Sequence, residues 1–201
     1  MDKWLEDGEQ TKITPKIKEI SEEISSNLEN DCDLEYIFET LRWIKNNFEL
    51  NDENKFEKNG KKGVFRRRTS IEIIEDGFLT GCTDFTLVYI PLARARGIPT
   101  KYLELVSKRW INKWKKEKER GKDKKRMKIK GHVVAKSKVN GNWYIVDPDS
   151  AEVQIDKKGN LKREDSSIFH RNMKILGEGK DSWDLGMRSL KDVKEFIYSN
   201  V

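Results

Sequence analysis

The sequence contains little cysteine, histidine and proline, and it has no long apolar run. Two of its 201 residues are Cys, two are His and four are Pro, whereas 38% are charged. No apolar run approaches the ~18 residues that a membrane-spanning helix needs. The N-terminus lacks the basic and apolar regions of a signal peptide. We therefore expect a cytoplasmic protein that has no membrane partner and whose thiols, Cys32 and Cys82, are reduced.

The few ligand-type side chains also argue against a metal centre. Cys32, Cys82, His132 and His170 contain no pair at the close spacing typical of zinc sites. The sequence has no internal repeat, no phosphate-binding loop and no serine nucleophile elbow. We expect neither a metal nor a cofactor.

The positive charge of the chain is concentrated in one segment. Residues 108–130 hold thirteen Lys/Arg and three acids, a local net charge of +10, so the rest of the chain carries −4 of the total of +6. Such a block favours a solvated excursion, with a short helix where Trp110 and Trp114 lie four residues apart. The alternatives are a flexible lid or a collar for an acidic partner, nucleic acid included, because tryptophans can stack on bases. No recognition motif accompanies the segment, which makes a polyanion the less favoured partner.

The stretch from residue 80 to 99 organises the chain. Thr80-Gly81 suits a helix start and Gly97 a helix stop, and the apolar spacing between them predicts a helix with one buried face. Pro91 lies inside this helix and is expected to kink or loosen it. Cys82 falls in the first turn, where free N–H groups and the helix dipole stabilise a thiolate, the nucleophilic form of cysteine. The alternative is a small buried filler.

Capping residues and apolar periodicity predict further helices on both sides of this one. They are residues 15–27 after the N-cap Thr14, residues 34–48, a short helix opened by Thr69 with Glu72 and ending near Gly77, and a last helix capped by Ser189 with Asp192. Cys32 begins the second of these helices but has no companion, so we interpret it as structural. Residues 1–13 are expected to be loosely held, and residues 51–68 to form a surface loop.

Residues 100–106 alternate as a strand, and Asn140-Gly141 is a strong hairpin signal between residues 132–139 and 142–146. A two-residue turn pairs positions whose numbers sum to 281, and a strand has a period of two. His132 and Asp147 are therefore diagonal neighbours on one face, close enough for their side chains to meet. Asp149 is an alternative partner for the imidazole.

The C-terminal third contains weaker signals. Residues 154–158 can add a strand that turns at 158–160, and residues 181–186 form a loop with Trp183 as a bulky anchor. His170 lies in a polar stretch without an acidic partner, so we interpret it as a surface histidine.

The chain resembles the transglutaminase-like superfamily of papain-type cysteine enzymes between about residues 33 and 149. The matching pieces are residues 81–85, 94–102, 131–134, 141–143 and 147–148, with residues 41–44, Phe48 and 68–69 upstream. The resemblance implies an α+β fold in which the cysteine helix packs on an antiparallel sheet that carries His and Asp. It also implies Cys82 as the nucleophile, His132 as the base and Asp147 as the group that orients the base. The chain departs from the pattern at Val134, where an aromatic is common.

We therefore expect residues 1–32 to be an N-terminal helical extension and residues 33–201 a transglutaminase-like domain with a basic insertion at 108–130. The expected activity is acyl transfer from a peptide or protein amide through a thioester, by hydrolysis or transamidation. The backbone N–H of Cys82 is one expected oxyanion donor, and the second is unassigned. The alternative is a non-catalytic module that holds an acidic partner through residues 108–130, and a weaker one is redox sensing by Cys82 with Cys32.

Overall fold

The computed structural model describes residues 2–56, 63–120, 128–156 and 172–201. Its helices are α1 (Pro15–Ser26), α2 (Asp33–Asn47), α3 (Ser70–Asp76), α4 (Cys82–Ala95), α5 (Lys108–Glu119) and α7 (Leu190–Asn200), with short 3-10 turns at Lys3–Leu5 and Asp52–Asn54. Its strands are β1 (Glu49–Leu50), β2 (Phe78–Leu79), β3 (Thr100–Ser107), β4 (Gly131–Val139), β5 (Asn142–Asp147), β6 (Glu152–Asp156) and β7 (Met173–Gly179). The fold is α+β, as the sequence predicts.

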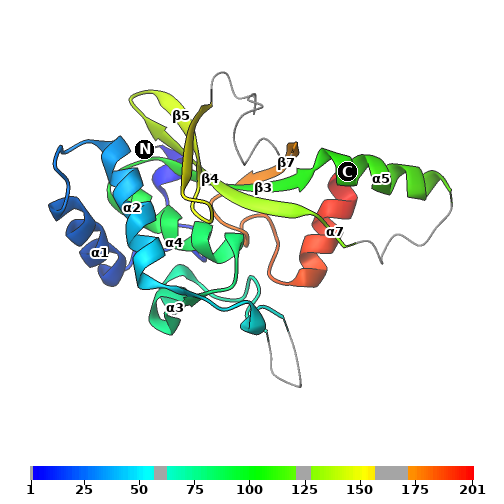
Figure 1. Ribbon diagram of the computed structural model, residues 1–201, viewed down its shortest axis with the longest axis horizontal. Coiled ribbons are helices and arrows are strands. Elements are labelled where there is room, and N and C mark those ends of the chain that lie inside the picture. Colours follow the sequence, from blue (N-terminus) through cyan, green and yellow to red (C-terminus); the bar gives the residue numbers. More distant parts are fainter. Residues whose placement is uncertain (1, 57–62, 121–127, 157–171) are drawn as a thin grey trace.

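An antiparallel sheet forms one layer of the molecule. Its strand order is β6-β5-β4-β3-β7, and β1 and β2 form a separate parallel pair. Helices α1 to α4 gather beside the sheet, whereas α5 and α7 lie together at the other end of the molecule (Figure 1). None of the helices within the described residues is long and apolar enough to cross a membrane.

Helix α4 is the centre of the core. It contacts α1, α2 and α3 as well as strands β3 and β4, and all of its residues from Thr83 to Arg94 are buried. The expectation of one buried face is therefore wrong, because helices and sheet enclose α4 on several sides. Helix α1 contributes to the same core through Ile17, Ile20 and Ile24. The domain boundary at residue 32 stays a prediction.

Pro91 does not interrupt α4, which runs as one helix from Cys82 to Ala95. Because proline has no N–H, the carbonyl of Leu87, four residues earlier, loses its helical donor. The Ser70 hydroxyl takes that place and donates to the Leu87 carbonyl over 2.6 Å. A side chain from α3 thus satisfies the carbonyl that Pro91 leaves free.

The hairpin has the predicted register. Val139 pairs with Asn142, Ser137 with Tyr144 and Ala135 with Val146, each pair summing to 281. Asn140 and Gly141 both have positive φ, at 50° and 77°, which fits the two-residue turn expected for Asn-Gly. The local turn chemistry therefore fixes how β5 lies on β4.

The N-terminal residues are not loosely held, contrary to the sequence-based expectation. Gln10 and Thr11 are 1% and 0% exposed. The backbone N–H of Gln10 donates to Asp181 over 2.8 Å, and its side-chain amide donates to the Arg68 carbonyl over 2.8 Å. The segment bridges two loops that are distant in the sequence. Hydrogen-bond partners far along the chain therefore hold in place a polar stretch that has no helix or strand signal of its own.

The expected surface loop at residues 51–68 is also partly wrong. Arg66 and Arg68 are 2% and 6% exposed, whereas Arg67 between them is exposed. Arg68 forms ion pairs with Asp76 on α3 and Asp84 on α4, at 2.8 and 2.7 Å. Arginine side chains can be buried here because carboxylates in the interior pair with their charge.

The first half of the basic segment is a packed helix rather than a solvated excursion. Helix α5 buries Trp110, Ile111 and Trp114, and both tryptophan rings stack with Tyr198 of α7, at centroid distances of 6.3 and 5.8 Å. The tryptophans are therefore not free to stack on bases.

The remaining helix predictions, for α1, α2, α3 and α7, are confirmed, with the caps at Thr14, Thr69 and Ser189 in place.

Some sequence-based predictions lie outside the described residues. These are the turn at 158–160, His170 with most of its polar stretch, and residues 121–127 of the basic segment.

Candidate active site

Cys82 is the first residue of α4 and is half-buried. The residue before it, Gly81, has φ of +140°, a backbone conformation that favours glycine. A Cβ atom at this position would also lie only 2.7 Å from Nζ of Lys55. The chain therefore turns into the helix at a glycine, and the missing side chain leaves room for Lys55 next to the start of the helix.

Asp84 holds this end of α4 in place. Its Oδ2 atom accepts hydrogen bonds from the Thr80 backbone N–H and hydroxyl, at 2.9 and 2.7 Å, and from Arg68 at 2.7 Å. The N–H groups of Asp84 and Phe85 donate to the Gly81 carbonyl, so the backbone N–H of Cys82 precedes the first hydrogen bonds of the helix. That N–H can serve as a donor to an oxygen atom near the thiol.

His132 and Asp147 come together as the hairpin register predicts. His132 Nε2 and Asp147 Oδ2 are 2.6 Å apart, and the two side chains are 4% and 0% exposed. The other carboxylate oxygen accepts from the backbone N–H groups of Asp149 and Ser150, at 3.2 and 3.4 Å. The carboxylate is thus held on both oxygens, which fixes the orientation of the imidazole.

The thiol lies beside this pair. Cys82 Sγ, a ring nitrogen of His132 and a carboxylate oxygen of Asp149 all lie within 4.8 Å of one another. Because Nε2 faces Asp147, Nδ1 is the nitrogen left to exchange a proton with Cys82. Asp147 rather than Asp149 takes the orienting hydrogen bond. The sulfur, nitrogen and oxygen atoms of this cluster are also ligand types that a zinc ion binds. A zinc ion there would coordinate the Cys82 sulfur and so block it as a nucleophile.

The site favours a protonated imidazole next to an ionised carboxylate. Burial alone lowers the pKa of His132, but Asp147 and Cys82 outweigh it and raise that pKa to about 10. Burial raises the pKa of Asp147, and the hydrogen bond and charge of His132 bring it below its usual value. At neutral pH the histidine therefore carries a proton that it can donate.

A buried charged cluster lies next to the thiol and was not foreseen from the sequence. Arg66 pairs with Glu104 of β3 over 2.7 Å, and Tyr102 donates to the same carboxylate oxygen over 2.9 Å. Burial lowers the pKa of Arg66, but Glu104 and, more weakly, Tyr102 and Cys82 raise it above its usual value. The guanidinium is thus a permanent positive charge within electrostatic reach of Cys82.

The backbone at Arg66 adopts an uncommon conformation, with φ of 57°. The indole N–H of Trp183 donates to its carbonyl over 2.7 Å, so the loop containing Trp183 holds the strained residue in place. Nothing in the local sequence signals this contact, because residues 66 and 183 are 117 positions apart.

A cavity of about 390 Å³ opens beside Cys82 and His132. Its walls come from the loop at Asp52–Phe56, from Phe65 and Arg66, from Glu104 on β3, from the start of β4 and from α7. The sequence-predicted nucleophile and base therefore line a cavity of the size that small ligands and side chains occupy.

Cys32, the other cysteine, does not line this cavity. Cys32 is exposed at the start of α2, where its sulfur accepts a hydrogen bond from the Glu35 N–H over 3.4 Å. Both cysteines are free thiols. Cys32 is thus an N-cap, in agreement with a structural role.

A solved structure resembles this fold. A "putative cysteine protease" from Cytophaga hutchinsonii superimposes with a TM-score of 0.57 at 16% identity, over 90% of this chain and 47% of that chain. A "putative protease" from Parabacteroides distasonis gives a TM-score of 0.42 at 14% identity, over 77% of this chain and 29% of that chain. This chain thus spans about half of the first protein. The search of curated proteins found no match.

The family model described as the transglutaminase-like superfamily matches residues 18–148. This stretch includes all of α4 and β4 and ends one residue after Asp147. The match covers more than half of the sequence and contains the cysteine, the histidine and the aspartate described above. This chain belongs to the transglutaminase-like superfamily.

Proposed function

We propose that the protein is a cysteine-dependent acyl-transfer enzyme that attacks a peptide or protein amide and forms a thioester on Cys82. The observation that supports it is the geometry of three groups. The thiol lies within 4.8 Å of a ring nitrogen of His132, and Nε2 of the same ring lies 2.6 Å from Asp147 Oδ2. Nucleophile, base and orienting carboxylate thus stand in the order that covalent acyl transfer requires.

The reaction follows from the protonation states. The Cys82 thiolate attacks the carbonyl carbon, and the backbone N–H of Cys82 donates to the oxygen that gains negative charge. His132 then gives its proton to the leaving nitrogen as the carbon–nitrogen bond breaks, which leaves a thioester and a neutral imidazole. Asp147 keeps the ring in position through both changes of charge.

The second half of the reaction reverses these transfers. Neutral His132 accepts a proton from a water molecule or an amine as that acceptor attacks the thioester carbon. The carbon–sulfur bond breaks, the acyl group leaves with the acceptor, and the thiolate and the imidazolium are restored. Hydrolysis is the favoured outcome because the cavity is open to water, whereas transfer to an amine needs a drier channel.

Alkylation of the thiol tests this proposal. In a Cys32→Ser background, which retains an N-capping side chain, iodoacetamide at pH 6 is expected to label Cys82 stoichiometrically. Replacing His132 with Ala is expected to slow labelling on the order of 10²-fold, because the thiolate loses its proton partner. The Cys82→Ala variant measures the labelling of sites other than Cys82. Equal and slow labelling with and without His132 would contradict the proposal.

Trapping of the intermediate is the direct companion experiment. With p-nitrophenyl acetate we expect a burst of one p-nitrophenolate per protein and an acetyl group on Cys82 that hydroxylamine removes. A burst that persists in Cys82→Ala would show that another residue is acetylated and would contradict Cys82 as the nucleophile.

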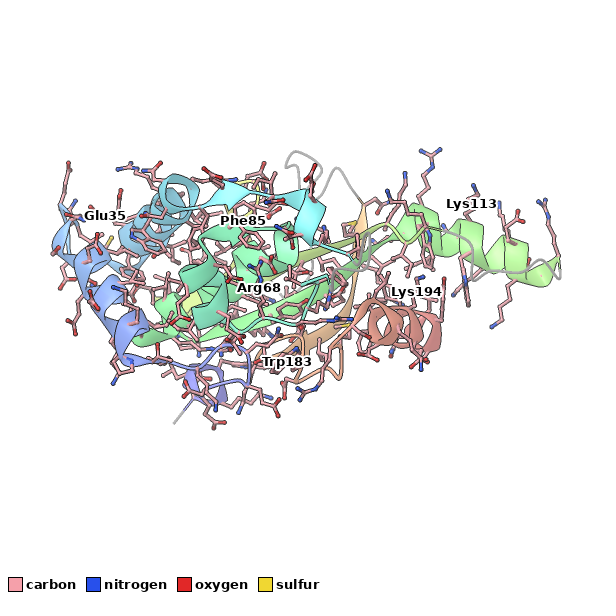
Figure 2. All side chains as sticks on the ribbon, turned by 90° about the horizontal axis from the view of Figure 1, so that it is seen from below. Glu35, Arg68, Phe85, Lys113, Trp183 and Lys194 are labelled. Carbon is pink, nitrogen blue, oxygen red and sulfur yellow. The ribbon has the colours of Figure 1, made fainter. Side chains whose placement is uncertain are left out.

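The polyanion-binding alternative has less support. The aromatic residues of α5 that could stack on bases are buried against α7, and only its basic outer face points to solvent, as Lys113 does in Figure 2. Salt-sensitive binding of a polyanion that survives Cys82→Ala, without any thioester, would favour this alternative.

A further inference from the structure

Helix α7 forms a wall of the cavity beside the thiol. Leu190, Val193 and Ile197, which recur on one stripe of α7, line the same cavity as Cys82 and His132. This helix lies outside residues 18–148, which carry the family match. One wall of the cavity is therefore a feature of this chain rather than of the matched region.

The walls of the cavity are largely apolar. Besides the three residues of α7, they include Phe56, Phe65, Ile129 and Val133. Phe56 and Leu190 are 41% and 40% exposed, although large apolar side chains are usually covered. Burying a ligand against these two side chains would remove apolar surface from water.

The charged groups of the cavity include a pair that is already matched. Arg66 and Glu104 form an ion pair at 2.7 Å, with both side chains 2% exposed. Their charges offset each other, and a second guanidinium nitrogen of Arg66 donates to Met187 Sδ over 3.6 Å. This pair therefore adds no net charge that would select an acidic or a basic side chain. The other charged residues of the lining are Asp52 and Lys128, which are exposed, and Lys55, which is half-buried, so solvent screens their charges.

Two contacts hold α7 in position. Tyr198 stacks with Trp114 of α5 at 5.8 Å and with Trp110 at 6.3 Å. On β7, a Cβ atom at Gly177 would lie 2.8 Å from the ring of Phe196. The sheet accepts α7 at this short distance because residue 177 has no side chain.

We propose that the cavity binds a large apolar side chain on the residue whose carbonyl Cys82 attacks, and that α7, supported by α5, sets this preference. A cavity lined by the nucleophile itself receives the side chain closest to the reacting carbon. The volume of about 390 Å³ accommodates an aromatic or long aliphatic side chain. This inference rests on the proposed function and specifies its substrate.

Chloromethyl ketones test the preference without requiring turnover. N-acetyl-X-chloromethyl ketones with X as Phe, Leu, Ala, Glu or Lys are reacted with the Cys32→Ser protein, and each rate is divided by the iodoacetamide rate. We expect Phe and Leu to exceed Ala by about 10- to 100-fold, with Glu and Lys at or below Ala. Equal rates, or a preference for Glu or Lys, would overturn the inference.

A substitution that fills the cavity locates the preference. Val193→Trp is expected to reduce the Phe and Leu rates to the Ala rate, with each rate divided by the iodoacetamide rate of the same variant. Glu195→Trp is the matched control, because Glu195 is on the same helix with its side chain 66% exposed. A preference for Phe that survives Val193→Trp would exclude this cavity.

The supporting role of α5 has its own readout. Trp114→Ala is expected to weaken the preference for Phe without changing the iodoacetamide rate, and Trp114→Phe is expected to restore most of it. An unchanged preference in a folded Trp114→Ala protein would remove α5 from the proposal. Iodoacetamide labelling that does not depend on His132 would instead contradict the proposed function, so the two failures are distinguishable.

Discussion

At the scale of single residues, the imidazole of His132 decides how the site behaves with pH. Its hydrogen bond with Asp147 and the neighbouring Cys82 raise its pKa to about 10 against the effect of burial. We expect the C–H resonances of His132 to titrate near that value in NMR spectra. His170, the only other histidine, is removed by His170→Gln to assign the signals.

Two variants separate the causes of this shift. Cys82→Ala and Asp147→Asn each remove one group that raises the pKa of His132, so both are expected to move the titration toward the ordinary value of about 6.5. A wild-type midpoint near 6.5, or a midpoint unaffected by both variants, would contradict the assignment of a protonated imidazole.

The same shifts set the sign of the stability change. The stabilisation from His132 is complete below its ordinary pKa and is lost as pH rises toward 10. The pKa of Asp147 is lowered, so its stabilisation is present above its ordinary pKa and is lost as pH falls. In urea titrations we expect the free energy of unfolding to fall between pH 7 and 10, and to fall less in Asp147→Asn.

Arg68 provides a second test at the residue scale. Its guanidinium pairs with Asp84 and Asp76 and donates to the Phe78 carbonyl. Arg68→Ala leaves the buried Asp84 without its cation, so we expect a loss of about 3–5 kcal/mol in the free energy of unfolding. The exposed neighbour Arg67 is the matched control. Equal effects of Arg67→Ala and Arg68→Ala in urea titrations would show that the buried pair is not stabilising.

At the scale of elements, α4 depends on α3 for one hydrogen bond. Ser70 donates to the Leu87 carbonyl that Pro91 leaves without a helical partner. Ser70→Ala is expected to cost about 1–3 kcal/mol of unfolding free energy, because a buried carbonyl loses its donor. In a Pro91→Ala background the new N–H of residue 91 can donate to the Leu87 carbonyl. Ser70→Ala should therefore cost less unfolding free energy in that background. A double-mutant cycle measures this difference, and strict additivity would contradict the compensation.

At the scale of the whole molecule, the N-terminal residues connect loops that are distant in sequence. The backbone N–H of Gln10 donates to Asp181, whereas its side-chain amide donates to the Arg68 carbonyl and accepts from the Ser182 hydroxyl over 2.5 Å. Gln10→Ala is expected to lower the free energy of unfolding by about 1–3 kcal/mol, because buried polar groups lose their partners. Glu9→Ala, at a side chain 62% exposed, should change it by less than about 0.5 kcal/mol. A negligible effect of Gln10→Ala would mean that the Gln10 side chain does not hold the loops.

The features that could be predicted from the sequence depend on neighbours within a few residues. The caps at Thr14, Thr69 and Ser189 begin their helices, and Asn140-Gly141 sets a register that carries Asp147 to His132. Turn and cap chemistry acts over two to four positions, so these signals can be read without knowing the fold. Of the site, the meeting of His132 and Asp147 followed from this register alone.

The features that escaped prediction depend on pairs that are distant in the chain. The Arg66–Glu104 ion pair, the Gln10–Asp181 hydrogen bond and the Trp114–Tyr198 stack join residues 38, 171 and 84 positions apart. Arg66 and Gln10 lie in polar stretches typical of surface loops, and Trp114 lies in a run of charge. Only packing decides whether such a side chain finds a buried partner.

By itself, the sequence determined the helices, the hairpin register and the meeting of a histidine with an aspartate, because each follows from short-range backbone chemistry. Tertiary structure decided that α4 is enclosed by helices and sheet, that Arg66 lies beside the thiol, and that α7 closes one side of the cavity. Those outcomes depend on which surfaces pack together, and packing brings together residues that carry no sign of one another in the sequence.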